Sequence, residues 1–217
     1  MKILVIATRN PGKKAEISDL LRDFPVAVKS LEDFGPIPDV IEDGATFEEN
    51  AFKKASFTAR VLGYPALSDD SGLVVAALGG APGVHSARWA GPNATDADKC
   101  RYLLEKMEHE TLRDAAFECV ISIAVPSGAA LTYEGRCEGI ILREPAGSNG
   151  FGYDPVFYYS PLGKTFAQLS MAEKSAVSHR GKALHEIKEE FDNVMKWADR
   201  HMPEPPPIGC QNPQHVT

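Results

Sequence analysis

The stretch PALSDDSGLVV, from Pro65 to Val75, places two adjacent carboxylates between two apolar runs. The runs Pro65–Leu67 and Leu73–Val75 are typical of a buried strand, whereas Asp-Asp-Ser-Gly is typical of a turn with Asx hydrogen bonds. If Asp69 and Asp70 lie instead at the partly buried end of a strand, their charges repel unless a cation or a proton compensates them. Mg²⁺ suits such a place, because it binds a few carboxylates together with waters and phosphate oxygens. The stretch therefore predicts either a turn or a metal site.

The sequence around this stretch alternates strand and helix patterns, which predicts an α/β fold. Residues 3–7 have the pattern of a buried strand, and apolar residues at helical spacing predict a helix from about Lys13. A second helix is expected to follow Thr46, with Glu49 completing a capping box, and a third to follow Thr95. The order of elements predicts both parallel and antiparallel strand pairing.

The C-terminal half contains a hairpin pattern followed by helices. Residues 117–125 and 131–142 flank a Pro-Ser-Gly turn, and polar residues alternate along the second arm. This pattern predicts a long antiparallel hairpin with one face in water. A capping box at Ser170 predicts a short helix, and one final helix is expected before Asp199. The proline-rich remainder, residues 200–217, is expected to be a disordered tail.

The composition is that of a globular protein with one domain, or one domain with two lobes. The chain has 217 residues, is 43% hydrophobic and carries a formal net charge of −7. This acidity argues against a nucleic-acid polymer as the ligand, because binding one requires a basic face. The four cysteines form no CxxC pair, and the N-terminal apolar run is too short for a signal peptide or a membrane span. We therefore expect a cytoplasmic protein without a membrane partner.

The hexapeptide TRNPGK, residues 8–13, lies between the first predicted strand and the first predicted helix. Backbone N–H groups and the helix N-terminus bind anions in such a turn. Lys13 adds a positive charge, and Thr8 and Asn10 add hydrogen-bonding groups. The segment is not a Walker A loop, because GxxxxGK[ST] is absent. It predicts a phosphate site, and a solvent-exposed turn is the alternative.

Three other segments carry candidate binding residues, each with a plainer structural explanation. Lys54 shares a helix face with Asn50 and reaches either a phosphate or the solvent. Phe151 lies in the sequence FGYD, where its ring either stacks on a base or fills the core. His179 and Arg180 are expected at the N-terminus of the final helix, where the macrodipole disfavours positive charge. They require a ligand or a buried anionic partner unless they are solvated.

These motifs follow one another in the order TRNPGK, FEENAFKKA, SDDSG, SARWAG, GFGYDPVF and EKSAVSHRG. Together they closely resemble the non-canonical purine nucleoside triphosphate pyrophosphatases, the Ham1-like family, over residues 1–191. The resemblance implies an elongated two-lobed α/β fold, with a central mixed sheet flanked by helices and an active cleft between the lobes. It also implies a homodimer that uses Mg²⁺ to hydrolyse ITP, dITP and XTP to the monophosphate and pyrophosphate. Residues 1–199 would form its single catalytic domain.

The resemblance further implies roles for individual residues. Asp70 corresponds to the proton acceptor and to a magnesium ligand, Glu42 to a second metal carboxylate, and Lys54 to a catalytic lysine beside the phosphates. Whether Asp69 binds the metal or orients its neighbour is left open. Arg180 or a backbone N–H is expected to donate to the 6-oxo group of the purine. The positions that correspond to substrate contacts are Thr8, Arg9, Asn10, Pro11, Gly12, Lys13, Ser71, Phe151, Gly152, Tyr153, Asp154, Lys174, His179 and Arg180.

Two other interpretations fit parts of the pattern. The Maf-like pyrophosphatases share a similar architecture, but their first loop has the pattern Ala-Ser-x-Ser-Pro-Arg-Arg where this chain has ATRNPGKK. A nucleotide- or RNA-binding module would use Phe151 and Tyr153 for stacking, but the net acidity and the carboxylate cluster count against it. Pyrophosphate release distinguishes the enzyme from the binding module, since the latter releases none.

Overall fold

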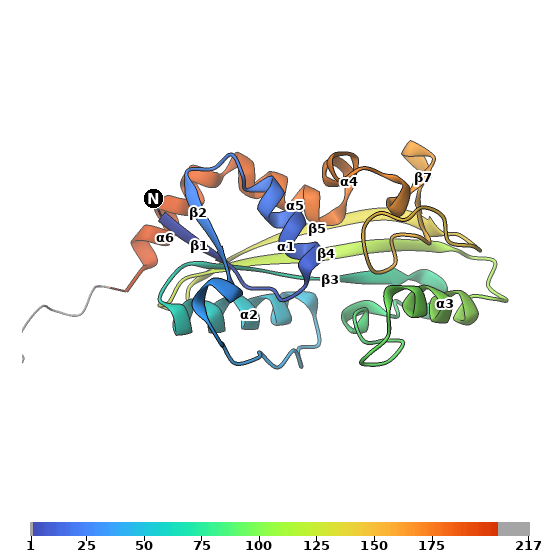
Figure 1. The fold of residues 1–217 in the computed structure, drawn as a ribbon, viewed down its shortest axis with the longest axis horizontal. Coiled ribbons are helices and arrows are strands. Elements are labelled where there is room, and N and C mark those ends of the chain that lie inside the picture. The colour runs from blue at the N-terminus through green and yellow to red at the C-terminus, as the bar shows by residue number, and fades with distance from the viewer. Residues whose placement is uncertain (1, 204–217) are drawn as a thin grey trace, which may run out of the picture.

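The computed structural model describes residues 2–203, which form one mixed sheet with helices on both faces (Figure 1). The strands are β1 (Lys2–Ile6), β2 (Val26–Ser30), β3 (Ala66–Val75), β4 (Asp114–Ala124), β5 (Ala130–Ile141), β6 (Phe157–Tyr159) and β7 (Lys164–Thr165). The α-helices are α1 (Pro11–Leu20), α2 (Phe47–Leu62), α3 (Asp96–Lys106), α4 (Met171–Val177), α5 (His179–Glu189) and α6 (Phe191–His201). The strand order is β2-β1-β3-β4-β5-β6-β7. The predicted α/β class and mixed sheet are confirmed.

The parallel part of the sheet is made by β1, β2 and the start of β3. Strand β1 pairs with β2 along its whole length, but with β3 only at Ala66 and Leu67. The chain then leaves the sheet after Ile6 and enters α1. Because β1 ends early, the edge of β3 beyond Leu67 has no strand beside it on that side within residues 2–203.

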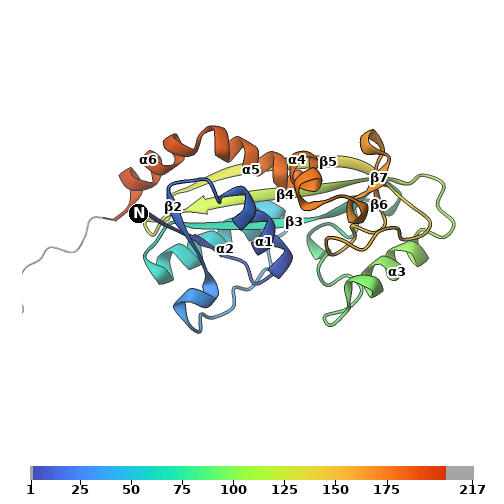
Figure 2. The ribbon, with the colours of Figure 1, turned by 45° about the horizontal axis from the view of Figure 1, so that its top comes forward.

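Strands β3, β4 and β5 run through the length of the elongated molecule and pair in antiparallel fashion (Figure 1). The predicted hairpin is confirmed: Tyr133 and Cys137 of β5 are buried, whereas Thr132, Glu134 and Arg136 are exposed. Helix α2 covers one face of this sheet, and α5 covers the other with α1 beside it (Figures 1 and 2). Helix α3 and strands β6 and β7 lie in the other half of the molecule, away from α1 and α2 (Figure 2).

The core is divided between the two halves of the molecule. One buried cluster contains Leu4, Ile17 and Leu184, from β1, α1 and α5. Another contains Leu103 and Phe166, from α3 and the segment after β7. Strand β4 contributes side chains to both clusters, so it joins the halves into one sheet. The predicted two-lobed shape follows from this division.

The C-terminal region differs from the sequence prediction, because the single final helix is in fact two helices. The break falls at Glu190, and it allows Phe191 at the start of α6 to pack on Phe24, with ring centroids 4.1 Å apart. Helix α6 continues to His201, and most of the expected tail, residues 204–217, lies outside the described residues. None of the helices within residues 2–203 combines the length and hydropathy that a membrane crossing requires.

The predicted N-cap residues of three helices are found at the helix starts, but one of the three capping boxes is incomplete. The hydroxyls of Thr95 and Ser170 accept N–H bonds and complete capping boxes. The Thr46 hydroxyl also accepts from the N–H of Glu49, but the Glu49 carboxylate accepts from Ala45 instead of Thr46. The predicted capping box of α2 is therefore only half formed.

Candidate active site

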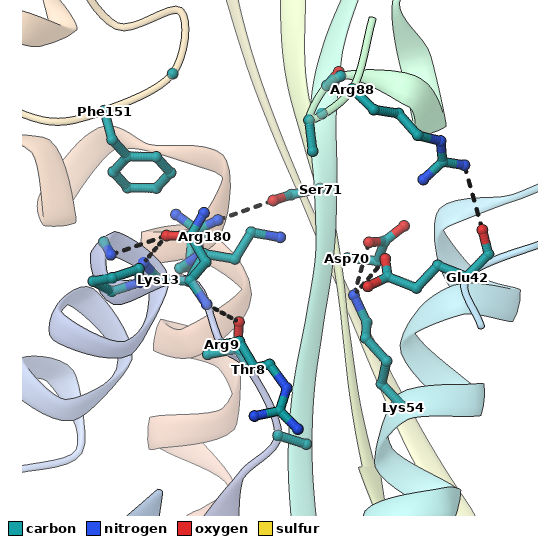
Figure 3. A pocket seen from close by; sticks show the side chains of 18 of the residues that line it. Thr8, Arg9, Lys13, Glu42, Lys54, Asp70, Ser71, Arg88, Phe151 and Arg180 are labelled. Atoms are coloured by element: carbon teal, nitrogen blue, oxygen red, sulfur yellow. Dashed lines mark hydrogen bonds and ion pairs between the residues drawn. The ribbon is translucent and has the colours of Figure 1, made fainter. Parts of the chain in front are cut away.

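The candidate site lies where strands β1 and β3 part. After Ile6 the chain turns into α1, whereas β3 continues to Val75 with β4 on its other side. A cavity of about 710 Å³ opens there. It is lined by the β1–α1 turn, the loop before α2, α2 itself, β3 and loops from the other half of the molecule. Figure 3 shows the side chains that face it.

The alternative of a turn at Asp69 and Asp70 is wrong, and the two residues lie inside the continuous strand β3 instead of at its end. Successive side chains of a strand point to opposite faces, so the two carboxylates have different surroundings. Asp70 faces α2, where it contacts Lys54. Asp69 faces α1 and α5, where it contacts Arg180. The adjacent carboxylates thus lie on opposite sides of the sheet, where each has its own cationic partner.

On the α2 side, the Lys54 ammonium lies between two carboxylates (Figure 3). Its Nζ is 2.9 Å from Oδ1 of Asp70 and 3.2 Å from Oε2 of Glu42, and it donates to the carbonyl of Asp69 at 2.9 Å. Asn50 donates to Asp70 at 3.3 Å and accepts from the N–H of Gly44 at 2.8 Å. Asn50 therefore ties the loop that carries Glu42 to the strand that carries Asp70.

Burial and the neighbouring charges shift the pKa values of this cluster. Burial raises the pKa of Asp70, although Lys54 and Lys13 act in the opposite direction. Burial also works against the charge of Lys54, but Asp70 and Glu42 outweigh it and raise the pKa of the lysine. Lys54 thus stays a cation, and the carboxyl of Asp70 is a stronger proton acceptor than an exposed aspartate.

The same carboxylates have the chemistry of a Mg²⁺ site. Mg²⁺ is bound in proteins by one or two carboxylates, and waters and substrate phosphates complete its shell. Asp70 and Glu42 are two oxygen ligands that approach one cation and face the cavity. No group of three or more His, Cys, Asp or Glu side chains suited to a metal occurs among residues 2–203. The residues therefore fit an ion that takes its remaining ligands from water and substrate.

On the opposite side of the sheet, Asp69 is fully buried in an ion-pair network. Nε and Nη2 of Arg180 lie 3.1 and 3.2 Å from its two carboxylate oxygens, and Lys13 is a second cationic partner. The Cys119 thiol donates to Asp69 at 2.8 Å. Burial alone would raise the pKa of Asp69, but Arg180 and Lys13 outweigh burial and hold this pKa well below its usual value. Asp69 orients cations and is not available as a proton acceptor.

Glu16 on α1 is a member of this network that the sequence analysis missed. Its carboxylate pairs with Nη1 of Arg180 and, at 2.8 Å, with Nζ of Lys174. Lys174 also pairs with Asp154, so buried charges of alternating sign run from Asp69 to the loop around Asp154. The only sequence signal was its place one helical turn after Lys13, next to the buried Ile17.

The loop of residues 150–154, called the FGYD loop below, closes one side of the cavity. The Phe151 ring lies under the Lys174 ammonium, 4.7 Å from its centroid, and against Gly12, where a Cβ would clash with the ring. Asp154 accepts from the N–H of Phe151 at 2.9 Å. Tyr153 is buried and its hydroxyl donates to the carbonyl of Ser86 at 3.0 Å. The loop thus presents one aromatic face to the cavity.

His179 lies at the start of α5 and is almost fully buried. Its ring stacks on Phe117, with centroids 4.8 Å apart and an interplanar angle of 12°. Burial, and then Arg180 beside it, hold the pKa of His179 well below its usual value, so the imidazole is neutral. In the described part of the chain its Nδ1 has no hydrogen-bond partner, although the residue lines the cavity.

The β1–α1 turn presents the N-terminus of α1 to the cavity. Oδ1 of Asn10 caps the helix by accepting from the N–H groups of Gly12 and Lys13, at 2.9 and 3.1 Å. Arg9 pairs instead with Asp39 at 2.7 Å and donates to the carbonyl of Ile37. Arg9 therefore holds the loop that precedes α2, and Lys13 is the cation of this turn closest to β3.

Arg88, in the sequence SARWAG, also reaches the cavity, and the sequence analysis gave it no role. Its guanidinium donates to the backbone carbonyl of Glu42 at 3.3 Å and lies 3.2 Å from Nδ1 of His85 (Figure 3). Arg88 thus connects the loop after β3 with the loop that carries Glu42.

Comparison with known proteins assigns the chain to a family. The model of the Ham1 family matches residues 4–190. The chain belongs to the Ham1 family. A dITP/XTP pyrophosphatase of Syntrophobacter fumaroxidans is 66% identical over 195 residues, which cover 90% of this chain and 84% of that protein. A dITP/XTP pyrophosphatase of Desulfotalea psychrophila is 56% identical over 205 residues, 94% and 92% of the two chains. The HAM1 protein structure from Coxiella burnetii superposes with a TM-score of 0.82 at 45% identity, covering 89% of this chain and all of that one.

In this Ham1 family member, every residue that the sequence resemblance implied for the site lines the same cavity. The residues come from the β1–α1 turn and the start of α1, the loop before α2, α2, β3, the FGYD loop, α4 and α5. Their individual roles stay predictions. Arg180 is 1% exposed and its guanidinium contacts Glu16, Asp69 and Ser71. It lies 5.7 Å from the centroid of the Phe151 ring, and the Lys174 ammonium lies 4.7 Å from it, so both cations flank this ring.

Proposed function

We propose that this Ham1 family member hydrolyses non-canonical purine nucleoside triphosphates (ITP, dITP and XTP) to the monophosphate and pyrophosphate, and so cleanses the nucleotide pool. One observation carries the proposal. A single cavity holds a carboxylate–lysine cluster on one side and an aromatic ring with buried cations on the other. The first suits a triphosphate and the second a purine. The names of the two relatives at 66% and 56% identity support the same reaction.

In the proposed reaction, Asp70 accepts a proton from the attacking water. The water oxygen bonds to the α-phosphorus, the bond from that phosphorus to the α–β bridging oxygen breaks, and pyrophosphate leaves with the bridging oxygen. The raised pKa of Asp70 suits this role. Lys13, Lys54 and the N-terminus of α1 offset negative charge on the phosphates. Because these groups are already held by the fold, little reorganisation is needed when charge develops.

We propose Mg²⁺ as the cofactor, held by Asp70 and Glu42. When bound, the ion would polarise phosphate oxygens and neutralise part of their charge. The protein contributes the position of the two carboxylates, through Lys54 between them and Asn50 behind them. Removal of divalent ions with EDTA is expected to abolish pyrophosphate release, and MgCl₂ in excess is expected to restore it.

The purine is proposed to lie against Phe151, with its 6-oxo group toward donors from Lys174, His179 or the backbone. Hypoxanthine and xanthine accept hydrogen bonds at this position. The 6-amino group of adenine would leave these donors unpaired, and such a loss can lower kcat/KM by several orders of magnitude. GTP also carries a 6-oxo group, so its rejection depends on position 2 of the ring.

A nucleotide panel tests the proposed function directly. We expect pyrophosphate release from ITP, dITP and XTP, and kcat/KM for ATP lower by about 10³-fold or more, as for a site that pairs with a substrate group the competitor lacks. The measurement is coupled pyrophosphate detection at matched nucleotide concentration, with GTP included. Equal kcat/KM for ITP and ATP would contradict the proposed selectivity, and no release from any nucleotide would contradict the reaction.

Substitution of Lys54 tests the carboxylate–lysine cluster. Lys54→Met is expected to lower kcat/KM for ITP by about 10²-fold, the usual effect of removing one group that stabilises charge in the transition state. Lys53→Met is the matched control, because Lys53 is 41% exposed and pairs with the exposed Asp43, whereas Lys54 is 12% exposed. The control is expected to keep wild-type kcat/KM. An equal effect in both variants would show that lysine charge in general, and not the position of Lys54, affects the rate.

The resemblance to Ham1 proteins further leads us to propose a homodimer in the cytoplasm, with residues 1–199 as one catalytic domain. Sedimentation equilibrium of the purified chain tests the first statement, and a monomer at micromolar concentration would contradict it. Fractionation of the source cells tests the second.

A further inference from the structure

Helix α3 lies outside the carboxylate–lysine cluster, yet two of its residues reach the backbone of the FGYD loop. The Cys100 thiol is buried and donates to the carbonyl of Gly152 at 3.3 Å. The Asp96 carboxylate lies close to the N–H of Gly152, which, against the opposing effect of burial, lowers the pKa of this carboxyl. Asp96 and Cys100 are four residues apart on α3, so both lie on one helix face. One residue of the loop thus has its carbonyl bonded by Cys100 and its N–H next to the Asp96 carboxylate.

Gly152 has a backbone conformation that allows the loop to turn. Its φ is +63°, a left-handed conformation that glycine adopts without strain. A Cβ at this position would meet no atom within 4 Å, so the conformation, and not lack of space, requires glycine. The neighbours on either side are fixed elsewhere: the Phe151 N–H by Asp154 and the Tyr153 hydroxyl by Ser86. The hydrogen bonds from α3 fix the peptide groups between these two anchors.

Both contacting groups are themselves held in place. Asp96 pairs with Lys99 at 2.9 Å, and both residues line the cavity. Cys100 packs in the same buried cluster as Tyr153. Burial, with Asp96 nearby, raises the pKa of the Cys100 thiol to about 12, so the thiol remains a hydrogen-bond donor at neutral pH.

We propose that Asp96 and Cys100 are positioning residues for base recognition: they fix Gly152 and thereby set the Phe151 ring against the purine. The inference rests on the proposed function, in which Phe151 contacts the base. In the proposed function the phosphates bind to Lys13, Lys54 and the N-terminus of α1, so a change in α3 should affect binding of the base and not of the phosphates. Loss of either contact should weaken recognition of the nucleoside part of the substrate and leave the pyrophosphate part unchanged.

The test compares four variants with a control on the same helix. Asp96→Ala and Cys100→Val remove the acceptor and the donor, whereas Asp96→Asn and Cys100→Ser keep them. The loss variants are expected to raise KM for ITP and Ki for IMP by about three- to tenfold, the effect of one modest hydrogen bond, with kcat and Ki for pyrophosphate within about twofold. Asp96→Asn and Cys100→Ser should restore most of the lost affinity. Arg101→Ala, an exposed position on α3, should match the wild type.

Three outcomes would overturn the inference while the wild type hydrolyses ITP. Unchanged Ki for IMP in both loss variants would remove α3 from base recognition. Equal weakening of IMP and pyrophosphate, or a lower kcat with a lower melting temperature and unchanged Ki values, would show a general loss of structure. A wild-type protein that releases no pyrophosphate from any purine triphosphate would instead contradict the proposed function, and IMP binding by calorimetry then tests the role of α3 alone.

Discussion

Asp70→Asn is expected to lower kcat for ITP by at least about 10²-fold, the usual scale for loss of a general base. The variant keeps the shape of the side chain but has no carboxylate to accept the proton. We expect its melting temperature to stay within about 4 °C of the wild type, the shift that roughly 1 kcal/mol produces in a chain of this size. The loss of the Lys54 pair is offset because a buried carboxylate, whose pKa burial raises, is replaced by a neutral amide. Steady-state pyrophosphate release and thermal unfolding measure the two effects.

The control for this variant is Asp43→Asn in the loop before α2. Asp43 is an exposed carboxylate that pairs with Lys53, so it tests the removal of one negative charge near the cavity without touching the cluster. It is expected to keep wild-type kcat. Near-normal hydrolysis by Asp70→Asn would exclude Asp70 as the proton acceptor, and a large fall in its melting temperature would assign the residue a structural role instead.

The local motifs could be predicted from the sequence because each depends on neighbouring residues. The cap at Ser170 and the alternation along β5 are set within a few residues, and both are found where they were expected. Helix α1 begins at Pro11, slightly before the predicted start at about Lys13, because Asn10 caps it. The site residues were identified by resemblance, and all of them line one cavity. The fold brings them together because β1 ends early and leaves the edge of β3 free for α1 and α2 to approach.

The partners of buried charges could not be predicted in the same way. Glu16 and Arg180 are 164 residues apart in sequence, and their contact depends on how α1 and α5 pack on one face of the sheet. A glutamate on a helix usually lies on the solvent-exposed face, so the sequence pattern gave no reason to predict that Glu16 is buried. Asp69 was ambiguous for a related reason: Asp, Ser and Gly favour turns locally, but pairing with β4 keeps them in a strand. Tertiary contacts decided both cases.

Asp69→Asn is expected to reduce stability far more than Asp70→Asn, although the two residues are neighbours. Asp69 is fully buried, and its charge compensates Arg180 and Lys13. Removing one partner of a buried ion pair leaves an uncompensated charge and costs about 3–5 kcal/mol of unfolding free energy. For a chain of this size the melting temperature should fall by roughly 10 °C. Thermal and urea unfolding measure the loss, and a melting temperature equal to that of Asp70→Asn would contradict the assignment of the two faces.

A double-mutant cycle with Arg180→Met identifies the partner responsible. In Asp69→Asn the Arg180 guanidinium remains buried and loses one of its two carboxylate partners, while Glu16 remains. If the pair Asp69–Arg180 causes the loss, adding Arg180→Met should cost much less in the Asp69→Asn background than in the wild type, with an interaction energy of about 1–3 kcal/mol. Additive effects would mean that Lys13 or the Cys119 thiol, and not Arg180, depends on the carboxylate.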